Sequence, residues 1–241
     1  MGDTLDSRFE DLFPGIRRYP YKGRDDFVTV INHEFTLPDR REYFLVTNLS
    51  KDTFETDFFN NDDNSWKEYF YNLQLLVAKM PLPPHEAAGR FLGQAILTAA
   101  NTDRRLDGLM ILTQGASHVM LDTSAKCPDE SFRPIDLVDR AFPTVVIETA
   151  LTESGQKLED DATRWVRASN GQVTAITIRL ERATENIVLR RWVWANNTAV
   201  IRQETTITNG CGNRRGQRSP ALITNEPFFI LPGAVRARCS G

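Results

Sequence analysis

Apolar positions along this chain occur either in short strand-forming runs or at the spacing of an amphipathic helix. The clearest apolar run, Val145–Ile147, is β-branched and ends in a carboxylate at Glu148. A continuous β-branched run predicts a strand that is buried on both faces. An ionised carboxylate at its end is costly unless it reaches water, a cation or hydrogen-bond donors. The strand therefore either meets the surface at Glu148 or holds this acid in place for chemistry.

Helical spacing of apolar residues predicts three amphipathic helices. The first is Trp66–Met80, which follows an Asp/Asn-rich loop at Phe59–Ser65. The second includes Ala87–Ile96 and follows a break made by three prolines. The third runs from about Gly155 to Ala168 and ends at a Ser-Asn-Gly turn.

Strand-forming runs bounded by turn residues predict a sheet between these helices. The predicted strands are a segment from Phe27 to Leu37, Tyr43–Leu49, a hairpin of Leu109–Leu112 with His118–Leu121, Phe142–Glu148, Val173–Leu180, two strands joined at Asn196–Asn197, and Pro227–Leu231. The expected fold class is α/β, with α+β as the alternative: a mixed central sheet flanked by helices. We expect residues 1–60 to form an N-terminal arm and strands packed on the core. Residues 61–241 are expected to form one domain with extra C-terminal strands.

Composition and charge narrow the class of protein. The chain has 241 residues, of which 41% are hydrophobic and 25% charged, as in an ordinary soluble globular protein. Its net charge of −3 provides no overall basic field to attract nucleic acid. No apolar run approaches the roughly 20 residues needed to span a bilayer, and no secretory signal opens the chain. We therefore expect an intracellular protein of the cytoplasm or nucleus with no membrane partner.

Cysteine and histidine show no metal-site spacing. The three cysteines, Cys127, Cys211 and Cys239, lie far apart and lack a paired motif. Two acids are more informative, because Asp129 and Glu148 lie at or near strands that can be neighbours. Carboxylates on adjacent strands suit Mg²⁺ or Mn²⁺, which bind few protein oxygens and keep several waters. Taken singly, each acid is explained better as a solvated surface residue.

Several short motifs taken together resemble a known superfamily. The motifs are His85-Glu86 on a helix, the segment KCPDESFRP at Lys126–Pro134, PTVVIE at Pro143–Glu148, Thr152-Glu153-Ser154, Leu158 and Asp161-Ala162. Their order resembles a fungal branch of the PD-(D/E)XK restriction-endonuclease-like superfamily. The strand–carboxylate–helix unit also looks like that of bacterial Uma2-type nucleases. The resemblance covers roughly residues 84–180.

The resemblance implies a restriction-endonuclease-like core and three site acids. It implies that Glu86 is the acid of the first core helix, Asp129 the aspartate of the PD pair and Glu148 the strand acid. These three residues would be catalytic and would hold the metal. The motif lysine is missing, because position 150 is alanine. The resemblance then points to Lys157 on the following helix, with Lys126 as a second possibility.

These implications lead to two functional hypotheses. The first is a Mg²⁺- or Mn²⁺-dependent nuclease that hydrolyses phosphodiester bonds of DNA or RNA, in which Lys157 orients the attacking water. The second is a catalytically degenerate nuclease-like fold that binds nucleic acid or protein. Ala150 favours the second hypothesis, whereas retention of all three acids favours the first. Self-association through the C-terminal hairpins, which would make a homo-oligomer, stays open as a weaker idea.

Other polar and aromatic features have simple structural explanations. Asp160 and Asp161 come near the start of a helix, where acids interact favourably with the helix dipole. Trp165, Trp192 and Trp194 are expected in packing rather than in base stacking. A solvated loop is expected for the basic residues Arg214, Arg215 and Arg218, although such a loop can contact phosphates.

Overall fold

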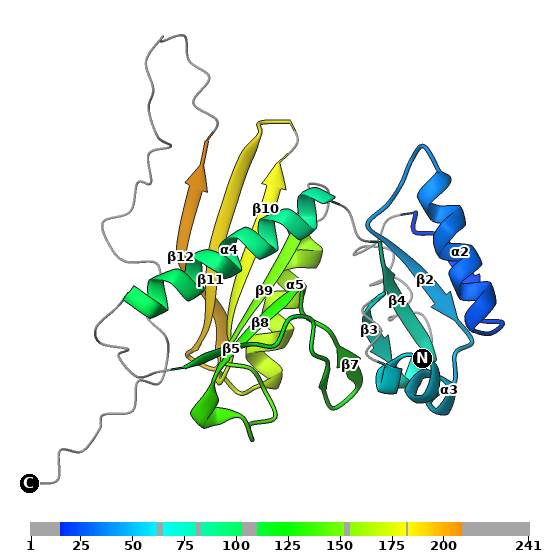
Figure 1. Ribbon diagram of the computed structural model, residues 1–241, viewed down its shortest axis with the longest axis horizontal. Coiled ribbons are helices and arrows are strands. Elements are labelled where there is room, and N and C mark those ends of the chain that lie inside the picture. Colours follow the sequence, from blue (N-terminus) through cyan, green and yellow to red (C-terminus); the bar gives the residue numbers. More distant parts are fainter. Residues whose placement is uncertain are drawn as a thin grey trace, which may run out of the picture.

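Two mixed sheets form the body of the protein. The computed structural model describes residues 15–61, 65–80, 83–102, 110–151, 155–181 and 183–208. Within these residues two six-stranded sheets lie side by side, and helices pack on them (Figure 1). The α/β class with a mixed central sheet flanked by helices is therefore confirmed. None of the helices in these segments is both long and apolar enough to cross a lipid bilayer.

The first sheet has the strand order β1-β2-β4-β3-β7-β6. Its strands are β1 (Arg18–Pro20), β2 (Tyr43–Thr47), β3 (Trp66–Phe70), β4 (Leu75–Lys79), β6 (Val119–Met120) and β7 (Ser124–Lys126). Only the β1–β2 pair among them is parallel. The helices α2 (Arg24–Thr36) and α3 (Lys51–Asp57) and a 3-10 turn at Phe59–Asn61 accompany this sheet. The sheet thus combines strands from residues 1–60 with strands from later in the chain.

The second sheet has the strand order β12-β11-β10-β9-β8-β5. Its strands are β5 (Ile111–Thr113), β8 (Glu130–Pro134), β9 (Val145–Leu151), β10 (Thr174–Glu181), β11 (Asn186–Ala195) and β12 (Thr198–Ile207). β9 and β10 are parallel and are joined by helix α5 (Gly155–Ala168), whereas the other neighbours are antiparallel. Helix α4 (Pro83–Thr102) precedes β5. The second half of the molecule therefore runs in the order α4–β5–β8–β9–α5–β10–β11–β12, interrupted by β6 and β7 of the first sheet.

The two helices of the second sheet cover opposite faces, and β9 is buried between them. Val145 and Ile147 belong to the apolar cluster under α4, whereas Val146 packs against Trp165 of α5. This alternation follows from the two-residue period of a strand. Glu148 has the parity of Val146, so its side chain points toward α5. The predicted strand does not reach the surface at this residue, because Glu148 is only 1% exposed.

The first sheet also uses its two faces differently. Phe44, Val46 and Leu76 pack with Phe27 of α2 and Phe54 of α3 in an aromatic core. The opposite face carries a smaller apolar cluster, which consists of Tyr43, Leu45, Leu75 and Val77. Tyr43 lies below the ammonium of Lys157 of α5, 5.1 Å from ring centre to nitrogen. This face therefore points toward the second half of the molecule.

The strand expected from Phe27 is wrong, because the segment is helix α2. Gly23 occupies the N-cap position, and Asp25 and Asp26 lie in the first turn, where acids are stabilised by the helix dipole. Phe27 and Val30 contact the aromatic core at helical spacing. The β-branched residues suggested a strand, and burial of one helical face outweighed that preference.

The helix expected over Trp66–Met80 is also wrong. This segment is the hairpin of β3 and β4, connected by a 3-10 turn at Tyr71–Leu73 and by Gln74 in the left-handed region. The register shifts between Trp66 and Glu68, so Lys67 is the extra residue of a β-bulge. The bulge places Trp66 and Tyr69 on the same face of the strand, three positions apart. This spacing imitates a helical period.

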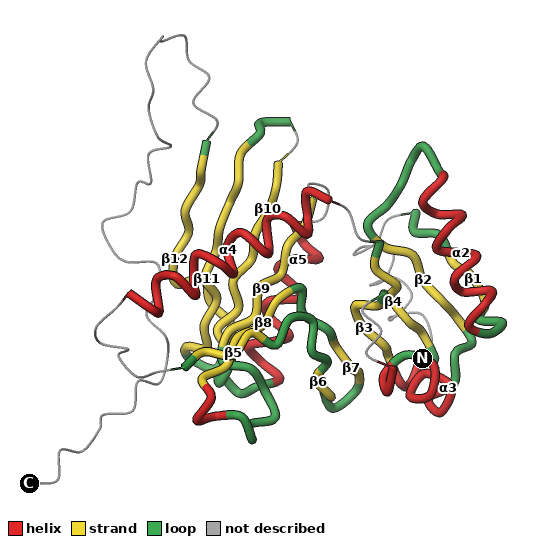
Figure 2. The backbone as a smooth tube through the Cα atoms, viewed as in Figure 1, coloured by secondary structure: helices red, strands yellow, loops and turns green. Residues whose placement is uncertain are grey.

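The hairpin expected at Leu109–Leu112 with His118–Leu121 is wrong as well. β5 pairs with β8 in the second sheet, whereas β6 pairs with β7 in the first sheet. The intervening turn, with Gly115 at φ +54°, directs the chain from one sheet to the other. Figure 2 shows β6 and β7 between the two halves of the molecule.

The remaining predicted elements that fall on described residues are confirmed. They are the strand at Tyr43–Leu49, the helix that includes Ala87–Ile96, the strand through Val145–Glu148, which continues to Leu151, the helix Gly155–Ala168, the strand Val173–Leu180 and the two strands joined at Asn196–Asn197. The predicted strand Pro227–Leu231, the arginines Arg214, Arg215 and Arg218, the cysteines Cys211 and Cys239, and the motif Thr152–Ser154 lie outside the described residues.

A buried charge network as candidate functional site

The chain crosses between the two sheets at the point where the predicted site acids lie. Strand β7 ends at Lys126, and the next N–H, that of Cys127, donates to the carbonyl of Lys67 at 2.9 Å. Two residues later the N–H of Asp129 donates to the carbonyl of Ile147 in β9 at 3.1 Å. Asp129 therefore lies where β3 of the first sheet approaches β9 of the second.

The ammonium of Lys67 joins the two principal acids. Its Nζ donates to Asp129 Oδ1 at 2.5 Å and to Glu148 Oε2. The β-bulge explains this direction, because it points Lys67 away from the aromatic core and toward the second sheet. The side chains of Lys67 and Glu148 are 1% exposed and that of Asp129 is 5% exposed. Two carboxylates thus share one cation inside the protein.

The second oxygen of each carboxylate is also held. Glu148 Oε1 accepts a hydrogen bond from the indole N–H of Trp165 at 2.5 Å. Asp129 Oδ2 accepts one from the backbone N–H of Thr149 at 2.7 Å. These bonds fix both carboxylate planes, so that one oxygen of each points at the ammonium of Lys67.

The charges in this cluster shift one another's ionisation. Burial by itself would lower the pKa of Lys67, but the negative charges of Asp129 and Glu148 outweigh burial and hold that pKa well above its usual value. Burial raises the pKa of Glu148, against the opposing effect of Lys67. Lys67 is therefore an ammonium at neutral pH. Perturbed pKa values in a compact cluster are more frequent at functional sites than elsewhere.

Glu86 joins the cluster through a second lysine. Lys79 Nζ donates to Glu86 Oε1 at 2.9 Å and to Asp129 Oδ1 at 3.2 Å. The side chain of Glu86 is 43% exposed and that of Lys79 is 12% exposed, so they form the open side of the site. Across the residues that the structure describes, no group of three or more His, Cys, Asp or Glu side chains is placed to hold one metal ion together.

A further buried group of charges surrounds Asp161 of α5. Lys126 donates to Asp161 Oδ1 at 2.5 Å, and Lys157 donates to its Oδ2. Burial opposes ionisation of Asp161, but Lys126 and Lys157 overcome that effect and hold its pKa well below the usual range. Glu68 lies within 3.6 Å of Lys126 and also pairs with Arg164. The helix-dipole explanation expected for Asp161 is therefore wrong, because this carboxylate is the acceptor for two buried lysines.

The predicted site residues are thus partly brought together. Asp129 and Glu148 share the Lys67 ammonium, and Glu86 is linked to Asp129 through Lys79. Lys157 donates to Asp161, one turn further along α5. Trp165, expected in packing, is fully buried and also bonds Glu148.

The amine at the two acids belongs to Lys67, which is not among the residues that the motifs predict. Its segment was assigned to a helix, where Lys67 would have been an ordinary surface residue. The available signal was the composition of Trp66–Phe70, in which aromatic residues typical of strands surround the lysine.

Two carboxylates meet at the Lys67 ammonium. The oxygens of Asp129 and Glu148 that meet at Lys67 are the ligand type that Mg²⁺ and Mn²⁺ prefer, and the ammonium marks a position where positive charge is already stabilised. Glu86 lies on the open side of the site. Occupation by a metal would require the Lys67 amine to move.

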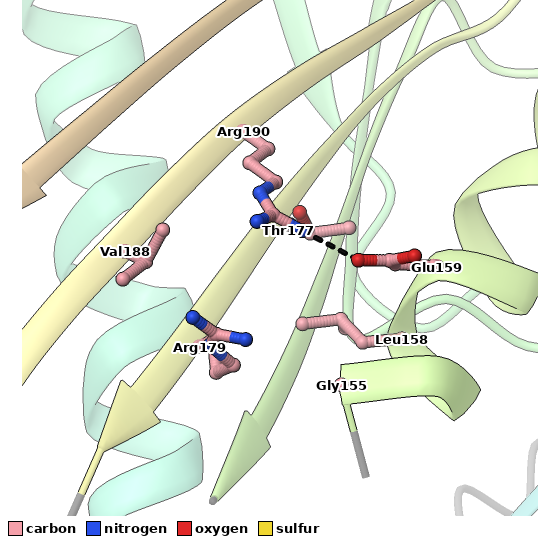
Figure 3. Close-up of a pocket in the computed structure, with 7 residues that line it drawn as sticks. All are labelled: Gly155, Leu158, Glu159, Thr177, Arg179, Val188 and Arg190. Carbon is pink, nitrogen blue, oxygen red and sulfur yellow. Dashed lines mark hydrogen bonds and ion pairs between the residues drawn. The ribbon is translucent and has the colours of Figure 1, made fainter. Parts of the chain in front are cut away.

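A small cavity lies on the other side of α5. It is lined by Gly155, Leu158, Glu159, Thr177, Arg179, Val188 and Arg190 (Figure 3). Its volume is about 10 Å³, which is room for about one water molecule. Arg190 donates across it to Glu159 at 2.5 Å. This cavity is too small to compete with the charge network as a candidate site.

The chain is an α/β protein in which the acids Asp129 and Glu148 and the amine of Lys67 meet between two sheets. No family model matches the chain, and no curated protein matches it. Among solved structures, the chain is similar to one described as "a putative nuclease belonging to DUF820 from Anabaena variabilis". The identity is 12%, the match covers 63% of this chain and 81% of that chain, and the TM-score is 0.39. A likeness of this size carries no conclusion about the chemistry of this chain.

Proposed function

We propose that the protein is a Mg²⁺- or Mn²⁺-dependent nuclease that hydrolyses phosphodiester bonds of DNA or RNA. The observation that supports this proposal is the convergence of Asp129, Glu148 and Lys67 from three separate elements. Burying such charges is costly, and a purely structural core gains little from them compared with apolar residues of similar size. A catalytic site provides a reason for keeping them.

Each residue would have a defined role. Asp129 and Glu148 would hold the metal, oriented by the Thr149 N–H and the Trp165 indole. When bound, the metal would lower the pKa of a water molecule and neutralise charge on the phosphate. Lys67, displaced by the metal from its place between the two acids, would replace the lysine missing at position 150 and would orient the attacking water from beside them. This role was expected of Lys157, whose amine is occupied by Asp161.

The substrate would approach from the side of Glu86 and Lys79. These are the more exposed members of the cluster, whereas Lys67 and Glu148 are enclosed. The Lys79 ammonium lies 3.2 Å from Asp129 Oδ1 and could contact a phosphate oxygen next to the metal. Lysine is a common phosphate ligand because its charge is compact.

The alternative is a degenerate nuclease-like fold that binds a partner without cutting it. One observation favours this alternative: the acids of the network already have cationic partners. The pairs are Glu68–Arg164, Glu86–Lys79, Asp129–Lys67, Asp129–Lys79, Glu148–Lys67, Asp161–Lys126 and Asp161–Lys157. A network balanced in this way can serve as a polar junction between the two sheets.

Metal binding and cleavage decide between the two functions. We expect the wild type to show Mn²⁺ binding in titration calorimetry and to cleave plasmid DNA or single-stranded RNA when metal is added. Glu148→Gln should lower cleavage by about a hundredfold or more, because it removes a charge that holds the metal. The control is Glu159→Gln, which changes a half-exposed acid of α5 paired with Arg190 and should leave cleavage unchanged.

Each outcome has a clear meaning. Metal binding without cleavage of either substrate would support the degenerate alternative. Absence of both metal binding and cleavage in the wild type would contradict the nuclease, as would unchanged cleavage by Glu148→Gln.

A further inference from the structure

We propose that the Asp129–Glu148 pair is a cation-exchange site in which the ammonium of Lys67 and a divalent metal ion compete for one position. The inference deepens the proposed function, because it rests on the same two acids as metal ligands. It adds that the metal-free protein supplies its own cation. Lys67, a residue of the first sheet, would then set the affinity of Asp129 and Glu148 for the metal.

The geometry places the ammonium where a metal would have to bind. One oxygen of Asp129 and one of Glu148 are both in hydrogen-bond contact with Lys67 Nζ, and their second oxygens are held by Thr149 and Trp165. The two carboxylates therefore cannot both turn toward a different point without losing those bonds. Any cation that bridges them takes the place of the amine.

Charge prevents both occupants from taking this one position together. Two positive groups within a few ångströms repel strongly where water is largely excluded, and the side chains around this point are 1–5% exposed. A divalent ion matches the two negative charges of Asp129 and Glu148, whereas the ammonium supplies only one positive charge. Lys79, at 3.2 Å from Asp129, supplies a second charge in the metal-free form.

Lys67 lies at an irregular position of its strand. It is the extra residue of the β-bulge in β3, where ladder pairing is interrupted. Its four-carbon side chain has several rotatable bonds, so the exchange would require a change of rotamer and of the packing around it rather than a change of strand pairing. Lys126 provides a matched comparison: it is equally buried, but its acid, Asp161, is also bonded by Lys157.

The test compares Lys67→Ala with Lys126→Ala in the full-length chain, with MnCl₂ as the probe. Mn²⁺ affinity is measured by titration calorimetry, and the thermal midpoint is measured with and without Mn²⁺. Lys67→Ala should bind Mn²⁺ at least about tenfold more tightly than the wild type, because the competing charge is gone. It should also melt at a lower temperature without metal and regain most of the loss when Mn²⁺ is added.

Lys126→Ala should be destabilised without any gain in Mn²⁺ affinity, because Lys67 still occupies the site. A second variant, Lys67→Ala with Glu148→Gln, removes one charge of each sign and should fold without gaining Mn²⁺ affinity. Should Lys67→Ala be unfolded in metal-free buffer, refolding by Mn²⁺ supports the exchange. Failure of Mn²⁺ to refold it overturns the exchange.

The outcomes separate this inference from the proposed function. Equal Mn²⁺ affinity of wild type and Lys67→Ala would overturn the exchange and leave the nuclease standing. Binding by Lys67→Ala alone would support the exchange and favour the degenerate alternative for the wild type. Absence of Mn²⁺ binding in both proteins would overturn both.

Discussion

Several buried side chains in this protein form ion pairs, and the contribution of each pair to stability depends on both of its members. Asp161 is 3% exposed and accepts from Lys126 and Lys157. Removing one member of a buried ion pair is strongly destabilising, because the remaining charge loses both water and partner. The pair itself need not be more stable than an apolar replacement. The loss of stability in a single variant at such a site therefore reports mainly the cost of leaving the remaining charge buried without a partner.

The lowered pKa of Asp161 predicts how stability depends on pH. Its contribution to the free energy of unfolding is fully present above its ordinary pKa of 3.8 and is lost as pH falls toward the lower value in the folded state. Asp161→Asn should lower the free energy of unfolding by about 3–5 kcal/mol at neutral pH, because two ammonium groups lose their carboxylate. The difference from wild type should shrink at about pH 3.

Urea unfolding at the two pH values measures this difference. Asp160→Asn is the matched control and should change stability by less than about 0.5 kcal/mol. A difference for Asp161→Asn that stays constant between neutral and acid pH would contradict the ion-pair assignment.

At the scale of elements, tight turns decide where the site-bearing strands lie. Helix α5 is followed by Asn170 and Gly171, both with positive φ, and the N–H of Gly171 bonds the carbonyl of Val166 at 2.9 Å. This left-handed C-terminal turn leads the chain into β10, which pairs with β9 beside Glu148. A Cβ atom at Gly171 would lie 2.6 Å from Cβ of Trp194.

Gly171→Ala should therefore destabilise the fold through both strain and overlap. We expect a loss of roughly 2–4 kcal/mol, about 1 from the positive φ and the rest from the clash with β11. Gly115→Ala is the control, because Gly115 also has positive φ but nothing lies within 4 Å of the added Cβ. Denaturant unfolding should show the larger loss for Gly171→Ala, and equal losses would argue against the overlap.

At the scale of the whole molecule, the charge network joins two sheets that each have an apolar core. The first sheet contributes Lys67, Lys79 and Lys126, and the second half contributes most of the acids. The chain itself crosses three times between the sheets: from β4 to β5, from β5 to β6 and from β7 to β8. Separation of the sheets would break both the ion pairs and the chain path, so the two halves are expected to unfold together.

Hydrogen exchange tests this cooperativity. Peptides covering β3–β4 and peptides covering β9–β10 should show the same free energy of opening for their slowest amides, since both open only on global unfolding. Opening of the first sheet at a lower free energy, while β9 stays protected, would contradict a single cooperative unit.

The sequence predicts an element correctly where the spacing of its apolar residues matches the regular period of one helix or strand. The Val145–Ile147 run and the stripe on Gly155–Ala168 predicted β9 and α5 correctly, and the paired asparagines predicted the β11–β12 turn. Prediction failed at Trp66–Met80, where a bulge imitated a helical period. That one misassignment also hid Lys67 from the candidate site.

The sequence by itself determined the α/β class and the strand that carries Glu148, because a run of apolar side chains is a local property. It also identified Asp129 and Glu148 as acids worth pairing. Only the tertiary structure decided which cation lies between them, because Lys67 is 62 residues from Asp129 and 81 from Glu148. Contacts over such separations depend on sheet pairing and on a bulge, and neither leaves a periodic signal in the chain.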